Sequence, residues 1–133
     1  MRTFVTWMLA MGMAAGTALA QERKTIYVDR MEGLEPFVEK ALQTAELPFD
    51  FIEEEKQPDL KANLAKMHST YGEILYKHKL GRNETHRLEL RDLQTKKVIA
   101  WHAFPLSGDD DSKRRAAQEF AEKVKQAWNK RKR

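Results

Sequence analysis

Two histidines, His86 and His102, occupy neighbouring predicted strands of one hairpin and are the most direct candidates for chemistry. His86 lies four residues before Leu90, and His102 lies four residues after Val98, so each pair shares one face of its strand. If the hairpin sets Leu90 opposite Val98, His86 lies opposite His102. Two facing imidazoles can bind zinc or copper. The spacing therefore predicts a metal or acid–base site at His86 and His102, with ordinary half-buried histidines as the alternative.

The turn of the preceding hairpin carries the most varied polar side chains of the chain. Around Gly81 and Asn83, which favour turns, stand Arg82, Glu84, His86 and Arg87. These side chains could bind an anion or exchange protons with a ligand, and an exposed hairpin with ion-paired flanks explains them equally well. The sequence has no Ser-His-Asp arrangement at a known spacing, no phosphate-binding loop and no HExxH helix. Its motifs therefore predict no catalytic residue and no cofactor.

The strand around Trp101 is apolar on both of its faces. Val98, Ala100 and Phe104 alternate along it with Ile99, Trp101 and Ala103. If helices cover only the first face, Ile99 and Trp101 are left for a protein partner or for a second copy of the chain. A small satellite core under a loop is the alternative. The pattern predicts an interface at Ile99 and Trp101.

The chain ends in four basic residues, Lys130, Arg131, Lys132 and Arg133. They account for the small positive excess, because the 24 basic residues less Arg2 leave 23 in residues 21–133, against 20 acidic ones. A basic tail can contact lipopolysaccharide, anionic lipid or another anionic envelope surface, without specific recognition of nucleic acid. A solvated helix end, placed favourably against the helix dipole, is the alternative.

The first 20 residues have the pattern of a secretory signal peptide. Arg2 precedes an apolar run over Phe4–Ala15, and the small residues Ala18 and Ala20 flank Leu19 before Gln21. We therefore expect cleavage after Ala20, export to the periplasm or the extracellular space of a bacterium, and one domain over residues 21–133. A retained anchor is the alternative, because Thr3–Ala20 is an uncharged stretch of 18 residues.

The chain contains no cysteine. This composition excludes disulfides, thiolate metal ligands and cysteine nucleophiles, and it excludes lipid attachment at a cysteine. We therefore expect a domain that packing alone stabilises.

The first half of the expected domain has a β-α-β pattern. Thr25–Asp29 and Phe49–Ile52 are rich in β-branched and aromatic residues and predict strands. Apolar residues at helical spacing between Leu34 and Ala45 predict a helix between them, so the two strands should be parallel. After them, Leu60–Leu64 alternates as a half-buried strand does, although its spacing also fits a helix.

The second half predicts an antiparallel meander and a final helix. Strands are expected over 73–78, 85–90 and 98–104, and an amphipathic helix over 113–130. Asp109, Asp110, Asp111 and Ser112 precede that helix as capping residues. A calcium loop is the alternative, but the ligand spacing of an EF-hand is absent. The expected fold class is α+β, with a mixed sheet of about five strands and two helices packed on one face.

This order of elements resembles the small α/β module of TolB and of curli-secretion-type, CsgG-like envelope proteins. In those modules an Ala-Asp-Tyr strand ends in glycine, and Pro58–Leu64 is the matching stretch here, without the glycine. A hairpin with Thr-Gly in its turn then leads to a Trp-bearing strand, and Leu90–Trp101 matches it with Lys96 in place of the glycine. The resemblance implies an interaction module of the periplasm or envelope and carries over no catalytic residue.

We therefore expect a small exported α/β protein that binds proteins or envelope components and is not an enzyme. Its partner would be another protein or a second copy of the chain, bound through the sheet face. The alternative is a small metal-dependent or acid–base enzyme around His86 and His102.

Overall fold

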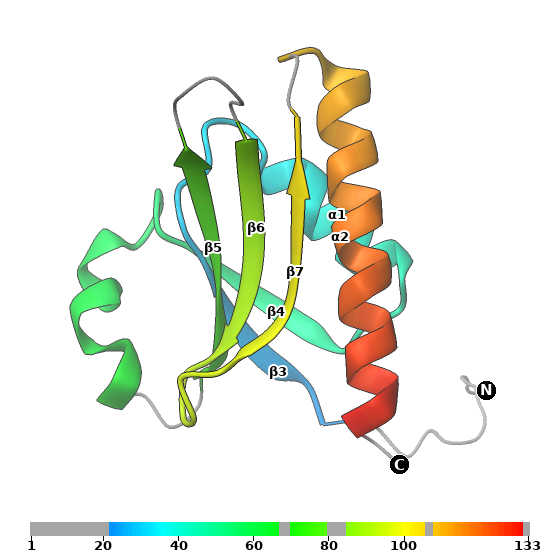
Figure 1. The fold of residues 1–133 in the computed structure, drawn as a ribbon. Coiled ribbons are helices and arrows are strands. Elements are labelled where there is room, and N and C mark those ends of the chain that lie inside the picture. Colours follow the sequence, from blue (N-terminus) through cyan, green and yellow to red (C-terminus); the bar gives the residue numbers. More distant parts are fainter. Residues whose placement is uncertain (1–21, 67–69, 80–84, 106–107, 132–133) are drawn as a thin grey trace, which may run out of the picture.

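Five short strands form one mixed sheet, and two α-helices cover one of its faces, as the computed structural model shows in Figure 1. The strands are β3 (Lys24–Val28), β4 (Phe49–Glu53), β5 (Thr70–Lys79), β6 (Thr85–Asp92) and β7 (Val98–Phe104). The helices are α1 (Glu35–Thr44) and α2 (Asp110–Arg131), and a 3₁₀ helix, η2, spans Pro58–Lys66. The spatial strand order is β4-β3-β5-β6-β7. The predicted fold class is confirmed.

The structure describes residues 22–66, 70–79, 85–105 and 108–131. The predicted signal peptide at 1–20, Arg82 and Glu84 of the polar hairpin, and Lys132 and Arg133 of the basic tail lie outside the described residues. None of the helices in the described ranges is long and apolar enough to span a membrane.

The β-α-β pattern forms as predicted, with β3 and β4 parallel and α1 between them. Pro36 stands in the first turn of α1, where the missing N–H costs no hydrogen bond. Glu35 is in the same turn, and its carboxylate accepts a hydrogen bond from the N–H of Gly33 (3.0 Å). The buried side of the helix includes Val38 and Leu42, so its apolar face packs on the sheet.

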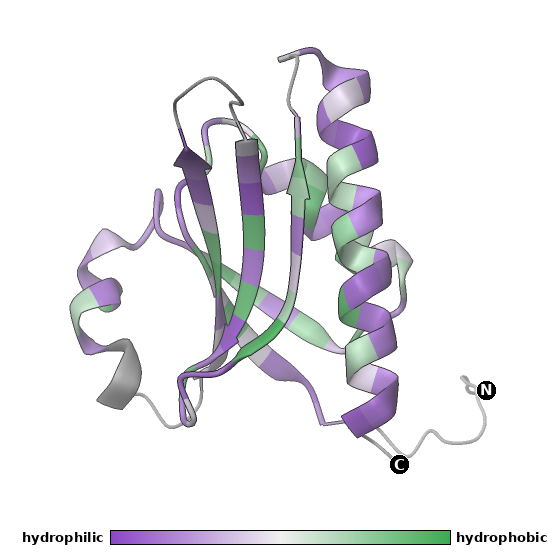
Figure 2. Ribbon diagram, in the orientation of Figure 1, coloured by the Kyte–Doolittle hydropathy of each residue, from purple (hydrophilic) through white to green (hydrophobic). Residues whose placement is uncertain are grey.

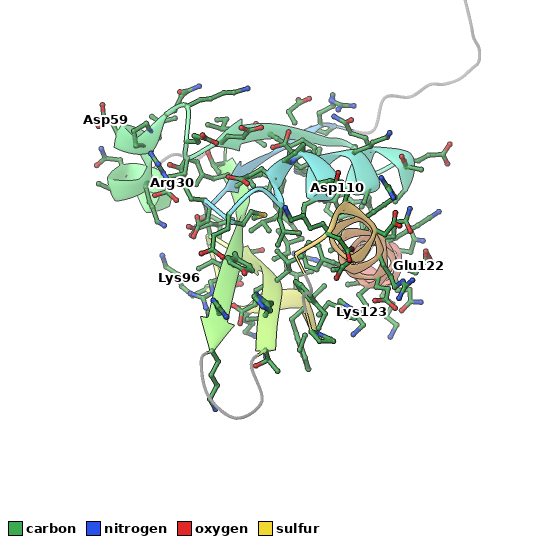
Figure 3. The ribbon with its side chains drawn as sticks, turned by 90° about the horizontal axis from the view of Figure 1, so that it is seen from above. Arg30, Asp59, Lys96, Asp110, Glu122 and Lys123 are labelled. Carbon is green, nitrogen blue, oxygen red and sulfur yellow. The ribbon has the colours of Figure 1, made fainter. Side chains whose placement is uncertain are left out.

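The stretch around Leu60 is a 3₁₀ helix, so the predicted strand over Leu60–Leu64 is wrong. Both edges of β3 are already occupied, by β4 on one side and β5 on the other, which leaves no place there for a further strand. Instead, η2 carries the chain across the face opposite α1 and α2 (Figure 3). There Leu60 packs with Ile52 against the buried Tyr27 and Leu93.

The main core lies between the sheet and the two α-helices. Helix α2 contributes five buried residues, Ala116, Ala117, Phe120, Ala121 and Val124. Apolar and polar residues alternate along β6, as Figure 2 shows, so one face of this strand joins the core and the other carries charges. Helix α2 begins where Asp109 accepts a hydrogen bond from the N–H of Ser112 (2.7 Å), which confirms the predicted cap.

The register of the β6–β7 hairpin differs from the prediction. The structure pairs His86 with Phe104, not with His102. The observed register is shifted by two residues from the predicted one. The first residue of this shift arises in the turn, in which the N–H of Asp92 donates to the carbonyl of Lys97 (2.9 Å). Lys96 adopts a left-handed φ of 64° in this turn, at the position where the TolB-type pattern has glycine. The second residue of the difference comes from a β-bulge in β7.

Candidate functional site

The β-bulge at the start of β7 decides which apolar side chains reach the surface. Leu90 pairs with Ala100 and Arg91 pairs with Val98, so Ile99 is the extra residue without a partner on β6. Ile99 is partly buried against the main core, whereas Val98 is 40% exposed. The predicted faces are therefore wrong at these two positions, because the bulge turns Val98 outward and Ile99 inward.

Trp101 lies on the open face of the sheet, opposite α1 and α2, and is 47% exposed. The guanidinium of Arg87 stacks over its ring, 4.2 Å from the ring centroid. The ammonium of Lys123, on the flank of α2 labelled in Figure 3, lies 5.5 Å from the same centroid. These cation–π contacts hold the indole in place while half of it remains accessible.

Arg87 is itself held by Glu89, which is only 3% exposed on the same face. The carboxylate of Glu89 lies 2.8 Å from Arg87, 3.1 Å from Lys77 and 3.2 Å from Arg91. Burial alone would raise the pKa of Glu89, but the hydrogen bond from Lys77 and the charges of the two arginines lower it below its usual value. Glu89 therefore stays ionised and fixes the arginine that supports Trp101.

A groove of about 720 Å³ lies between the first half of β7 and the last turns of α2. Its lining includes both predicted interface residues, Ile99 and Trp101, and the two described residues of the predicted anion surface, Lys130 and Arg131. Sequence reasoning treated these as separate features. The structure brings them together because the end of α2 packs beside the start of β7.

Arg131 ties the end of α2 to the sheet. Its guanidinium bonds to the hydroxyl of Tyr71, lies 5.3 Å from the centroid of that ring, and lies 3.5 Å from the carboxylate of Asp92. Burial opposes ionisation of Asp92, but hydrogen bonds from the N–H groups of Thr95 and Gln94 and the charge of Arg131 lower its pKa. Of the two described tail residues, Arg131 is therefore paired within the domain, whereas Lys130 lines the groove without an ion pair to another described residue.

The two histidines of the predicted site have different partners. His86 is buried, pairs with His78 of β5, and stacks on its ring at a centroid distance of 4.2 Å. Its Nδ1 lies 2.5 Å from the hydroxyl of Tyr76, which donates a hydrogen bond to the carboxylate of Glu32 (3.2 Å). His102 instead faces α2, where its Nε2 lies 3.1 Å from the carboxylate of Glu119. The expected face-to-face arrangement of His86 and His102 is therefore wrong.

Within the described ranges, no group of three or more His, Asp or Glu side chains is arranged to hold a metal ion. The ring of His86 lies between Tyr76, His78 and Phe104 in a stack of nearly parallel rings. Stacked imidazoles direct their nitrogen lone pairs along the ring planes and not toward one shared point. This geometry is that of a packed aromatic cluster at the edge of the core.

A cluster of charged groups, which the sequence did not predict, lies at the carboxyl ends of β3 and β4. Asp29 follows β3, Glu54 follows β4, and the Lys61 ammonium of η2 lies 3.1 Å from Asp29 and 3.5 Å from Glu54. The chain leaves β3 toward α1 on one face and leaves β4 toward η2 on the other, which is a topological switch point. The sequence does show acidic residues at the ends of two predicted strands, which is the one signal of this cluster. It does not show the strand order that brings these residues together.

Glu73 of β5 completes this cluster, 4.0 Å from Lys61 and hydrogen-bonded to Asp29. Burial and the hydrogen bond with Asp29 raise the pKa of Glu73 to about 8. Glu73 therefore keeps its proton over a pH range in which an exposed glutamate has lost it. The Lys61 ammonium lies within 4.0 Å of all three carboxyl groups, so the cluster fastens η2 to the sheet.

No protein-family model and no curated protein matches the sequence. Among solved structures, the crystal structure of TolB from Acinetobacter baumannii matches with a TM-score of 0.55 and 15% sequence identity. The match covers 83% of this chain and 29% of the TolB chain, so the protein corresponds to less than a third of TolB. At this identity the likeness concerns the fold alone, and in that respect a weak resemblance to TolB is confirmed.

Trp101 and Trp128 offer a matched test of surface against core. Trp128 packs edge-on between Phe49 (5.3 Å) and Tyr71 (5.6 Å), whereas Trp101 is half exposed. We expect Trp101→Ala to lower the free energy of unfolding by less than about 1 kcal/mol, and Trp128→Ala by about 3 kcal/mol. Urea unfolding followed by far-UV circular dichroism measures both. A loss in Trp101→Ala as large as that in Trp128→Ala would place Trp101 in the core.

The raised pKa of Glu73 predicts a stability that falls as pH rises. Between the usual value of 4.5 and about 8, the folded state keeps a proton that the unfolded state has released. We expect the wild type to lose on the order of 1–2 kcal/mol more unfolding free energy than Glu73→Gln between about pH 5 and about pH 8. Glutamine can donate to Asp29 as the protonated acid does, but it does not titrate.

Urea titrations at stepped pH measure this difference, with Glu55→Gln at an exposed position as the control. Burial and a hydrogen bond with Glu53 also raise the pKa of Glu39 to about 8. Because Glu39 is present in all three proteins, its contribution to the pH dependence cancels in the comparison. Parallel pH curves for the wild type and Glu73→Gln would contradict the raised pKa of Glu73.

Proposed function

We propose that the protein is an exported, non-enzymatic module of the bacterial envelope that binds a protein partner through the groove between β7 and α2. The observation that carries this proposal is the half-exposed Trp101, fixed by two cations at the mouth of an open groove. Tryptophan and arginine dominate the binding energy of protein interfaces, and a preordered ring loses little entropy on binding. Val98, 40% exposed, adds apolar area beside it.

Export and envelope location rest on two further supports. Residues 1–20 have the charge, apolar run and small-residue exit of a signal peptide. The TolB-like fold is compatible with a periplasmic protein. Because a likeness in fold does not carry function, this location stays part of the proposal.

The groove is better suited to binding than to catalysis. Asp92 is the one carboxylate among the described residues that line the groove, and Arg131 together with two backbone N–H groups already satisfies it. None of the described residues that line the groove is a histidine. General acid–base chemistry needs a proton donor or acceptor that is free to reach the substrate, and the one carboxylate among the described lining residues is held by Arg131.

Site-specific photo-crosslinking in the native cell envelope tests the proposal. A photoreactive amino acid at Val98 should form a discrete adduct with one partner, because this side chain borders the groove. The same amino acid at Asp50, an exposed position of β4 at the opposite edge of the sheet, should form none. The Val98 adduct should fall at least about tenfold when Trp101→Ala is added.

Equal adducts at Val98 and Asp50, or an adduct at Val98 that survives Trp101→Ala, would contradict binding through the groove. Circular dichroism of each variant confirms that the fold is retained, so a lost adduct reports a lost contact.

A further inference from the structure

We infer that the groove accepts an extended acidic peptide segment, which adds as a sixth strand to the outer edge of β7. This inference rests on the proposed function and names the chemistry of the partner. An edge strand, two exposed apolar side chains and a row of lysines combine at one place.

The first component is backbone. β7 is the last strand in the sheet order, so it pairs with β6 along one edge only. Every second N–H and C=O of an edge strand points away from its neighbour and can pair with an added chain. The groove runs along the first half of β7, from Val98 to Trp101, beside the last turns of α2, and an added strand would lie in it.

The second component is side-chain contact. Val98 and Trp101 both lie on the open face, because the bulge at Ile99 shifts the alternation between them. In an added strand, side chains on that face would pack against these two residues, and cross-strand pairs of this kind stabilise sheets. β-Branched or aromatic residues at alternate positions of the peptide suit them.

The third component is charge. Lys97, Lys123 and Lys130 line the groove, and none of them forms an ion pair with another of the described residues. Asp92, the acidic residue of the lining, is neutralised by Arg131. The net charge of the groove is therefore positive, and carboxylates on the second face of an added strand would complement it.

The same lysines disfavour a second copy of the chain as the occupant. Two β7 edges pairing with each other would bring both sets of Lys97, Lys123 and Lys130 together. Lysines along an edge strand are a common protection against self-association. A lipid surface or a nucleic acid would satisfy these charges but would leave the β7 edge and the Trp101 groove unused, so we favour the acidic peptide.

Fluorescence anisotropy with synthetic peptides tests the inference on the purified protein. The probe is a labelled peptide of about ten residues in which Glu alternates with Val or Thr. We expect a dissociation constant below about 100 µM at an ionic strength of about 0.15 M. A peptide with Lys in place of every Glu should bind at least about tenfold more weakly.

Alternate backbone N-methylation of the acidic peptide separates strand addition from simple charge attraction. Only every second N–H of an added strand faces β7, so methylation of one alternate set should weaken binding at least about tenfold. Methylation of the other set should change it little. Equal tolerance of both methylated sets would overturn the inference.

Two lysine variants locate the site. Lys123→Glu in α2 should weaken binding of the acidic peptide about tenfold, whereas Lys40→Glu in α1 makes the same change of net charge away from the groove. Equal effects of both variants would overturn the inference. Binding to phosphatidylglycerol vesicles or single-stranded DNA that exceeds peptide binding and survives Trp101→Ala would identify a general anion surface instead.

The outcomes also separate this inference from the proposed function. A Val98 photo-adduct that depends on Trp101, together with no preference for acidic peptides, would leave a protein-binding groove but refute its acidic, strand-adding occupant. If the acidic peptide binds but no adduct forms in the envelope, the inferred binding chemistry of the groove would stand and the proposed function would be refuted.

Discussion

The single extra residue in β7 is the constraint on which the rest of the site depends. The turn after Asp92 starts β7 in a register that would direct Ile99, rather than Ala100, to pair with Leu90. The bulge restores the core pairing of Leu90 with Ala100, and it thereby places Trp101 opposite Glu89, on the same open face as Val98. The exposed apolar pair beside the groove therefore depends on one local irregularity, as is common where a strand borders a binding site, whereas the free edge follows from the place of β7 at the end of the sheet.

Charged side chains on the open face then hold Trp101, which the bulge exposes, in a fixed position. A sheet face that water reaches cannot be wholly apolar, and here Glu89 gathers Lys77, Arg87 and Arg91 around one buried carboxylate. Such a network is of limited value for stability, because its cations remain partly solvated. Its effect is positional, since Arg87 carries the ring of Trp101. The remaining positive charge lies on the groove lysines Lys97, Lys123 and Lys130, which form no ion pair with another of the described residues.

Local patterns predicted the elements but not their alignment. Alternation and helical spacing placed all five strands and both α-helices, because each depends on neighbours in sequence. The register of β7 includes a bulge at which Ile99 packs against the main core, a contact between residues distant in the sequence. The predicted pairing of His86 with His102 was therefore wrong. The place of the 3₁₀ helix on the sheet involves the ion pair of Lys61 with Asp29 and the packing of Leu60 on Tyr27, and both are contacts between residues distant in the sequence. The groove joins two predicted features whose contact is purely tertiary.

Amide hydrogen exchange along β7, followed residue by residue by NMR in the isolated protein, tests the central claim most directly. A free edge predicts alternation: amides that pair with β6 should exchange slowly, and those between them, which point away from β6, should exchange fast. The pattern should not change as the protein is diluted. Uniform slow exchange along the whole strand would show that α2 or another copy of the chain covers this edge, and it would contradict the account.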